Sequence, residues 1–360
     1  MLADDFIKNS GNRREDLYEM VKKNIKQLRE YYDEEVTEKY SDEALAWILF
    51  VDGCATLQFI HSVDKNKVKD FKIKNDHVAF VQQDLLLLEN QLPYQLLDDL
   101  MKMSKEGQNL MTSILNFIVQ KCMLANDEPT TKKFIEMATN GEPIHLLDLL
   151  RKRLLFDSTP KSPKEVTGQS SMKDLHLFRN VHELKEAGIH LKPNNSSCLG
   201  QISFTNFYLG ILLLPPITVD DSTGPKFFNL IAYEMCPDFE NDFGVSSYIV
   251  FLDSLIDEAK DVMHLRKARI LRNFLGSDEE VAQLFNGLCT DLVQNTEIYD
   301  DVRSKIQDYY NKQWKTWISE GLHTHFSSPW TVMAFLAALF AILATGVQTV
   351  YSVLAYYKSP

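Results

Sequence analysis

The chain has 360 residues, a formal net charge of −12 and 45% hydrophobic residues, so it is long enough for one large domain or two smaller ones with a hydrophobic core. Its basic residues form no stripe along the sequence, which argues against a nucleic-acid partner and against electrostatic adsorption to anionic lipid. The five cysteines are scattered without a CxxC or Cys/His ligand pattern. We therefore expect buried thiols in a reducing compartment, no metal site and no cofactor.

The N-terminal half, residues 1–156, is predicted to be helical. Leu17, Val21, Ile25 and Leu28 recur at three- and four-residue steps, which is typical of an amphipathic helix. Ser41, followed by two acidic residues, is a good start for a second helix, whose apolar stretch is too hydrophobic to face water. We expect the aspartate in the middle of that stretch to be buried and therefore paired.

A break interrupts the next helical stretch at Glu89, Asn90, Gln91 and Pro93. Proline cannot continue a helix but suits the first turn of a new one. The three polar residues before it lie between leucines, in the setting of either a binding corner or a polar hinge. The pattern favours the hinge, because a helix break needs polar partners for its freed backbone groups whatever the function.

Residues 157–173 are rich in Ser, Pro, Thr and Lys and are predicted to be a linker or exposed loop. The second half, 174–326, begins with a short helix. The runs IHLKP, LGQISFTNFYL and ILLLPPITVDD then indicate two or three short strands.

Helices are predicted again at Phe227–Met235, at Tyr248–Leu275 as either one long or one interrupted helix, and from about Thr296 to Ile318, with a capping box at Ser277 before another helix. The predicted fold class is mainly α: a multi-helix domain with a small two- to three-strand β element and one C-terminal transmembrane helix.

The membrane prediction depends on residues 327–357, which contain no charged side chain. A membrane span needs about 20 mostly apolar residues, and aromatic rings at both ends suit the headgroup level. We expect a single-pass helix at 329–357 with the lipid bilayer as its partner. With no N-terminal signal and three residues after Tyr357, this is a tail anchor in the plasma membrane or an endomembrane, with the body in the cytosol.

Two residues inside this predicted helix are candidates for helix pairing. Gly346, among small neighbours, would let a second helix approach closely, and Gln348 could hydrogen-bond to it. Both residues favour pairing with a second copy of the chain, so a homo-oligomer is one candidate assembly.

Several strings occur together in a fixed order: VDGC at 51–54, LLLLENQLPYQLL at 85–97, ELKEAGIHLK at 183–192, FFNLIAYEMC at 227–236 and DVMHLRKARILRNFLGSDEEVAQLFNGL at 261–288. In these strings and in its C-terminal apolar run, the chain resembles the plant "domain of unknown function 247" family from about Asp16 onward. Members usually begin with a further segment carrying a pattern like SIGPYHHG. This chain lacks it, so we expect a truncated relative or a mis-chosen start at Met1.

The resemblance implies a plant-specific, mainly helical protein with one membrane helix near its C-terminus and no agreed biochemical activity. Some grass members of the family are linked to pollen-side self-incompatibility, which implies protein–protein recognition at a membrane. The family motif defines no recognition residues that could be carried over to this chain.

No GxxxxGK[ST], GxGxxG, HExxH or GxSxG pattern occurs, so the usual phosphate, dinucleotide, zinc-protease and serine-hydrolase sites are not predicted. We expect a non-enzymatic interaction or signalling module with an unknown protein partner. Two alternatives remain open. One is a pollen or cell-recognition determinant outside the cell, where sequons at Asn194 and Asn195 would be modified. The other is an enzyme whose site is assembled from distant residues.

Overall fold

The structure, a computed structural model, describes residues 1–71, 73–124, 128–140, 143–156, 180–207, 209–237, 239, 242–290, 292–311, 333 and 337–349. It divides into two compact units, Met1–Arg303 and Ser304–Pro360. The predicted linker at 157–173 lies outside the described residues.

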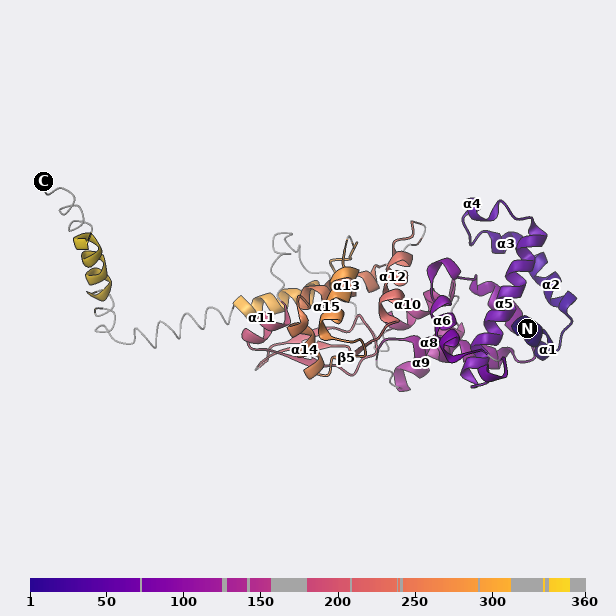
Figure 1. The fold of residues 1–360 in the computed structure, drawn as a ribbon, viewed down its shortest axis with the longest axis horizontal. Coiled ribbons are helices and arrows are strands. Elements are labelled where there is room, and N and C mark those ends of the chain that lie inside the picture. Colours follow the sequence, from indigo (N-terminus) through magenta and orange to yellow (C-terminus); the bar gives the residue numbers. More distant parts are fainter. Residues whose placement is uncertain are drawn as a thin grey trace. The chain divides into compact units, whose positions relative to one another are not determined.

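The N-terminal region of the first unit is built around one long helix. Its elements are α1 (Leu2–Ser10), α2 (Arg14–Lys23), α3 (Ile25–Arg29), α4 (Glu34–Thr37) and α5 (Asp42–Asp64). Helices α1, α2 and α3 all pack against α5 (Figure 1). The four predicted apolar positions of α2 and α3 are buried, which confirms the amphipathic pattern. Asn24 separates the two helices.

Helix α5 is a core helix. It is the one helix among the described residues that is long and apolar enough to cross a membrane, but 56% of its apolar window is buried inside the fold. Ser41 caps it, with its Oγ accepting from the backbone N of Ala44 at 3.2 Å. Gly53 allows α7 to approach, because a Cβ there would lie 2.8 Å from Leu100. The expectation that Asp52 is buried was wrong, since this residue lies on the exposed side of α5.

The break that Pro93 predicts is confirmed by the next elements. They are η1 (Val68–Phe71), α6 (Asn75–Asp84), η2 (Leu88–Asn90), α7 (Tyr94–Met103), α8 (Gly107–Lys121), α9 (Glu128–Asn140) and α10 (Leu146–Leu155). Pro93 is the N-cap residue of α7 and is buried. Helix α8 packs against α5, α7 and α10, and so connects the N-terminal helices with the rest of the unit.

The predicted β element is confirmed and is slightly larger than expected. After α11 (Val181–Glu186) follow β1 (Ile189–Pro193), β2 (Ser203–Thr205), β3 (Gly210–Leu214), β4 (Ile217–Val219) and, later, β5 (Leu271–Asn273). Strand β3 lies between β1, which is parallel to it, and β2, which is antiparallel. Strands β4 and β5 form a separate parallel pair.

The helical stretch predicted at Tyr248–Leu275 is interrupted, as in one of the two alternatives, but it ends in a strand: it consists of α13 (Gly244–Leu255), α14 (Ala259–Lys267) and β5. The chain turns before β5 at Arg269, which has a positive φ of 61°. Pairing with β4 then holds Leu271–Asn273 as a strand. This partner is distant in sequence, so local periodicity could not reveal it.

Two further helices complete the described core of this unit. Helix α12 (Thr223–Glu234) contacts η2, α10, α13 and α15 (Asp278–Leu288). Ser277 caps α15 as predicted, accepting from the backbone N of Glu280 at 3.2 Å. A last helix begins at residue 300 and is described to residue 311. The fold class is therefore mainly α with two small sheets.

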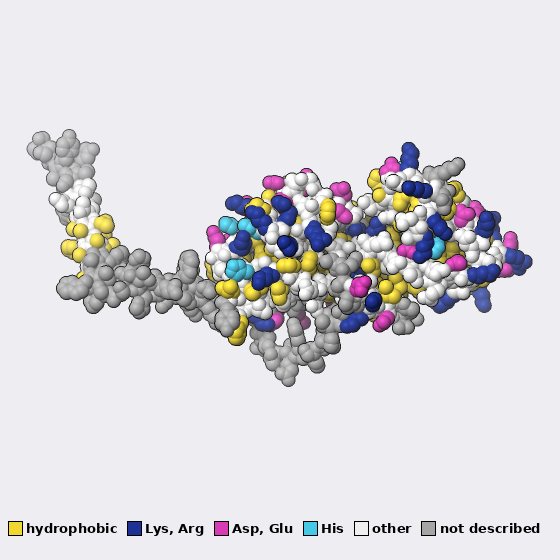
Figure 2. All heavy atoms as spheres, turned by 90° about the horizontal axis from the view of Figure 1, so that it is seen from below, with side chains coloured by type: hydrophobic (Ala, Val, Ile, Leu, Met, Phe, Trp, Pro, Cys, Tyr) yellow, Lys and Arg dark blue, Asp and Glu magenta, His cyan; other side chains and the backbone are white. Residues whose placement is uncertain are grey.

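Within the range predicted to span the membrane, the described helix is Ala337–Thr349, which is shorter than the roughly 20 residues of a membrane span. The transmembrane helix predicted at 329–357 is thus not shown, and much of that range lies outside the described residues. All the side chains of the described helix are exposed, among them Phe340 at 74% and Ile342 at 70%. Figure 2 shows apolar side chains on the face of this helix that is in view.

Candidate functional site

The four residues of the predicted corner between α6 and α7 differ in their exposure to solvent. Glu89 and Asn90 are exposed, whereas Gln91 is partly buried and Pro93 is buried. Asn90 donates to the carbonyl of Asp84 at 3.2 Å. The corner therefore presents two polar side chains to solvent and directs the other two residues into the fold.

Gln91 joins the corner to α10. Its Nε2 donates to the carbonyl oxygens of Leu85 at 3.0 Å and Leu87 at 2.7 Å, and its Oε1 accepts from the backbone N of Leu147 at 2.9 Å. One side chain thus satisfies backbone groups at a helix break and at a helix start. These are the contacts of a polar hinge, and a binding role for the corner stays a prediction.

The same corner also contacts α12. The backbone N of Leu88 donates to Oδ1 of Asn229 at 2.7 Å, although the two residues are 141 positions apart. Asn229 in turn donates to the carbonyl of Pro225 at 2.8 Å. Two of the strings that carry the family resemblance, at 85–97 and 227–236, therefore meet in space.

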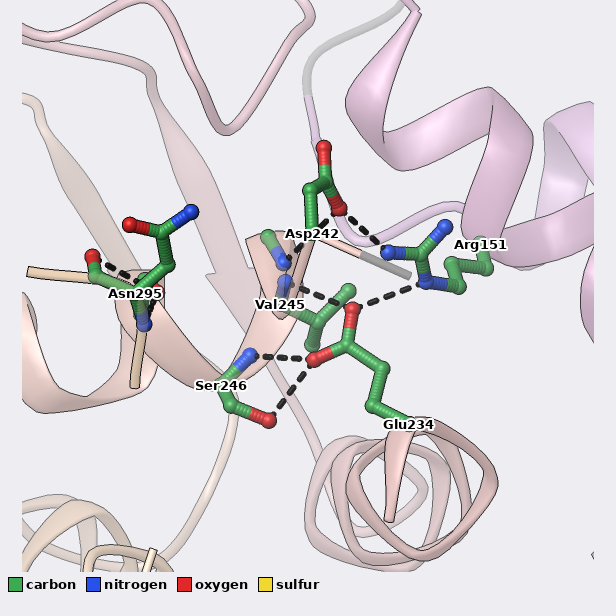
Figure 3. Close-up of polar contacts among 8 residues, drawn as sticks. Arg151, Glu234, Asp242, Val245, Ser246 and Asn295 are labelled. Carbon is green, nitrogen blue, oxygen red and sulfur yellow. Dashed lines mark hydrogen bonds and ion pairs between the residues drawn. The ribbon is translucent and has the colours of Figure 1, made fainter. Parts of the chain in front are cut away.

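The most extensive polar group in this part of the fold surrounds Glu234, at the C-terminal end of α12 (Figure 3). Its Oε1 accepts from Nε of Arg151 at 2.8 Å and from the backbone N of Val245 at 3.0 Å. Its Oε2 accepts from the backbone N of Ser246 at 2.8 Å and from its Oγ at 2.7 Å. Because Val245 and Ser246 lie in the first turn of α13, the carboxylate occupies a helix N-terminus, where negative charge is favoured.

Arg151, on α10, connects this carboxylate with a second one. Its Nη2 donates to Oδ1 of Asp242 at 2.6 Å, and its guanidinium carbon lies 5.3 Å from the ring centre of Phe239. The side chain of Asp242 is 67% exposed, whereas those of Arg151 and Glu234 are 10% and 0% exposed. We call Arg151, Glu234, Asp242, Val245 and Ser246 the Glu234 cluster.

A further buried group lies at the start of α10. His145 is the N-cap residue, and its Nδ1 accepts from the backbone N of Asp148 at 3.0 Å. Burial lowers the pKa of His145 to about 4, against the opposing effect of the Asp148 carboxylate, so the ring stays neutral near neutral pH. Oδ2 of Asp148 accepts from the backbone N of Ile144 at 2.9 Å and pairs with Lys152 at 2.8 Å.

The geometry of the Glu234 cluster is that of a structural junction. Four donors occupy the two oxygens of Glu234, so this carboxylate has little capacity left to accept from a substrate. Asp242 is the one member of the cluster with a mainly exposed side chain. The cluster fastens α10, α12 and α13 together, which is the role expected of a fully satisfied buried polar network.

Known proteins share this chain's sequence pattern over nearly its whole length. Residues 1–344 match the domain of unknown function 247, described as a plant protein of unknown function. The chain belongs to this family. No solved structure matches it.

Two relatives from Arabidopsis thaliana show how far the similarity extends. UPF0481 protein At3g47200 is 29% identical over 358 residues, covering 90% of this chain and 72% of the relative. Putative UPF0481 protein At3g02645 is 27% identical over 170 residues, covering 47% of this chain and 32% of that relative. Their names assign neither protein a ligand or a reaction.

The Glu234 cluster was not predicted from the sequence. A glutamate in the otherwise apolar string FFNLIAYEMC, and an arginine in the leucine-rich α10, were the available signals, because a buried charge requires a partner. The sequence does not say which charge pairs with which. Gly346 and Gln348 lie on the exposed helix of the second unit, and nothing lies within 4 Å of a Cβ built on Gly346, so their pairing role stays a prediction.

Proposed function

We propose that this plant protein is a non-enzymatic interaction module that a C-terminal helix at 329–357 anchors in a membrane. The uncharged run at 327–357 supports the anchor. So does its described part, which is helical and carries exposed apolar side chains. Such a helix is poorly suited to water and well suited to lipid.

The observation that carries the interaction role is a set of exposed apolar side chains close together in the N-terminal sequence. This N-terminal apolar surface comprises Tyr31 at 44% exposure, Val36 at 55%, Tyr40 at 37%, Trp47 at 47% and Ile48 at 38%. Large exposed apolar groups that adjoin one another are typical of protein interaction sites, and we propose that these five form such a patch.

Trp47 is the candidate anchor residue of this surface. Its ring centre lies 5.6 Å from that of Tyr18 and 5.8 Å from that of Phe50, and Phe50 is buried. These contacts hold the tryptophan in place before a partner arrives. Less side-chain entropy is then lost on binding, as is favourable for a hot-spot residue.

Two of the described thiols, Cys54 and Cys289, support a non-enzymatic role, because a reactive cysteine needs an accessible thiolate. Burial raises the pKa of Cys54 to about 12. Burial and the neighbouring Asp253 raise that of Cys289 to about 12. Both groups are therefore protonated under physiological conditions.

Proximity labelling of the full chain in plant cells tests the interaction role. We expect Trp47→Asp to lose a defined set of labelled proteins that the wild type retains. Phe207→Asp is the matched control, because it places the same charge at another exposed aromatic ring, which is 86% exposed. The proposal fails if the two variants are present at wild-type levels and label the same proteins as the wild type.

We also propose that the body faces the cytosol, and glycosylation mapping tests this orientation. Asn195 is the informative sequon, because it is exposed, whereas Nδ2 of Asn194 is engaged by the carbonyl of Gln201. With a sequon tag added after Pro360, we expect glycan on the tag and none on Asn195. Glycan on Asn195 would instead support the recognition determinant displayed outside the cell.

A further inference from the structure

A second group of charged side chains lies at the opposite end of α12 and is not explained by the Glu234 cluster. It contains Gln82 of α6, Lys121 and Cys122 at the end of α8, Asp220 after β4, and Lys226 in the first turn of α12. We call this set the lysine cluster. It is independent of the proposed interaction role.

The backbone brings these segments together. The N–H of Thr218 donates to the carbonyl of Met123 at 2.8 Å, and Leu124 forms an antiparallel bridge with Ile217. This pairing places the end of α8 alongside the connection between β4 and α12. The ammonium of Lys121 donates to Oε1 of Gln82, which adds α6 to the group.

Lys226 is the anomalous member of the cluster. It is 7% exposed, yet its side chain makes no hydrogen bond, and no ion pair within 4.0 Å, with any residue that the structure describes. Its Nζ is not among the fully buried side-chain atoms that lack a hydrogen-bond partner, so the ammonium keeps some contact with solvent, but burying most of a lysine without a partner is still unfavourable. The position of Lys226 in the first turn of α12 makes its charge still less favourable, because the helix dipole disfavours positive charge there. No hydrogen bond or ion pair from the described residues therefore neutralises this charge.

The surrounding charges leave an excess of positive charge. The charge of the Asp220 carboxylate acts on both lysines, but its Oδ1 already accepts from the backbone N and Oγ of Ser222, at 2.9 and 2.6 Å, and from Oγ1 of Thr223 at 3.1 Å. Burial lowers the pKa of Lys226, Asp220 opposes this effect, and the positive charge of Lys121 adds to it. One carboxylate, with one of its two oxygens used by its own turn, thus acts on two ammonium groups.

We propose that Lys121 and Lys226 form a binding site for a phosphate group. A phosphate oxygen would accept from both ammonium groups and would supply the counter-charge that Lys226 lacks. Lysine suits this role, because it binds phosphate as a compact point charge with three donors. Lys121, Asp220 and Gln82 are partly exposed, so the cluster can be reached from solvent.

Thermal unfolding of the purified full chain in detergent tests this site with inorganic phosphate as the probe. We expect phosphate to raise the unfolding temperature more than chloride at the same ionic strength, because it binds the folded state. Lys226→Met should weaken phosphate binding at least about tenfold by removing a charged donor. Lys192→Met, at an exposed lysine of β1, should leave it unchanged.

Asp220→Asn separates a binding role from a structural one. Asparagine keeps the oxygen that accepts from Ser222 and Thr223 but removes the negative charge. We therefore expect phosphate binding to strengthen several-fold, on the order of the effect of one nearby charge. If Lys226→Met does not fold, Lys121→Met should show the same loss of binding.

The source of the phosphate group is distinguished by two further probes. A soluble inositol phosphate that competes with inorganic phosphate indicates a free metabolite. Binding to phosphatidylinositol phosphate vesicles, but not to phosphatidylcholine vesicles, indicates a lipid headgroup, and this binding should be lost in Lys226→Met. The proposal is overturned if phosphate and chloride act equally on the wild type, or if both lysine variants fold and respond to phosphate as the wild type does.

Discussion

The two ends of α12 carry charged groups in opposite states. At the C-terminal end, Glu234 is fully buried and receives four hydrogen bonds, two of them from the first turn of α13. At the N-terminal end, Lys226 is nearly as buried and has no hydrogen bond or ion pair with the described residues. The charge of Glu234 is thus stabilised by partners within the fold, whereas the charge of Lys226 has no such partner among the described residues and is available to a ligand.

This difference is informative because a buried charge alone does not indicate function. Structural junctions and binding sites both contain charged side chains, and both are hard to recognise in a sequence. Whether the fold itself supplies the counter-charge is the distinguishing property. By that property the Glu234 cluster is structural, and the lysine cluster is a candidate ligand site.

Glu234→Ala tests the structural end most strongly. The substitution leaves Arg151 without its buried partner and removes the acceptor of two backbone N–H groups. We expect the free energy of unfolding to fall by about 3–5 kcal/mol, measured by chemical denaturation. A loss below about 1 kcal/mol, the scale of a surface ion pair, would show that the cluster does not hold α10, α12 and α13 together.

The pH dependence of stability tests the buried group at His145. Its pKa is 6.5 in an unperturbed state and about 4 in the fold, so the unfolded chain binds more protons between these values. The contribution of His145 to the free energy of unfolding is therefore fully present above pH 6.5, and it falls by up to about 3 kcal/mol as the pH is lowered toward 4. The variant His145→Asn keeps an N-cap acceptor but does not titrate, so it should lack this component. If the free energy of unfolding depended on pH in the same way in the wild type and in His145→Asn, this prediction would be contradicted.

Gln91→Ala tests the predicted hinge. Three hydrogen bonds are lost, one of them from the start of α10, so we expect a loss of about 1–2 kcal/mol in denaturation experiments. The neighbouring Asn90→Ala is the control, since Asn90 is exposed and should change stability by about 0.5 kcal/mol or less. A larger loss of stability in Asn90→Ala than in Gln91→Ala would show that Gln91 is not the hinge residue.

Asp242→Asn should have the smallest effect within the Glu234 cluster. The side chain is 67% exposed, and asparagine keeps the oxygen that accepts from Arg151 and Gly244. We expect a loss below about 1 kcal/mol, as for an exposed ion pair. A loss of stability as large as that of Glu234→Ala would mean that the exposed Asp242 carboxylate, rather than Glu234, holds the three helices together.

The sequence predicted the features that depend on local chemistry. The break before Pro93, the cap at Ser277 and the first strands follow from residue types within a few positions of each other. Strand β5 was missed because its partner, β4, is distant in sequence. Asp52 was placed inside the fold because a uniformly apolar helix does not reveal which side faces solvent.

The candidate sites were harder to predict than the fold, for the same reason. Arg151 and Glu234 are 83 positions apart, and no local pattern relates them. The lysine cluster combines residues from α6, α8 and α12. The sequence showed that basic residues form no stripe, but it could not show that two lysines meet in the fold.

One measurement tests the comparison between the two ends of α12 directly: the free energy of unfolding of Lys226→Met with and without phosphate. Without phosphate, we expect the variant to be at least as stable as the wild type, because an apolar side chain replaces an unpartnered buried charge. With saturating phosphate, the wild type should become the more stable protein. A variant that is less stable than the wild type by the same amount in both conditions would contradict the account, because Lys226 would then be a structural residue like Glu234.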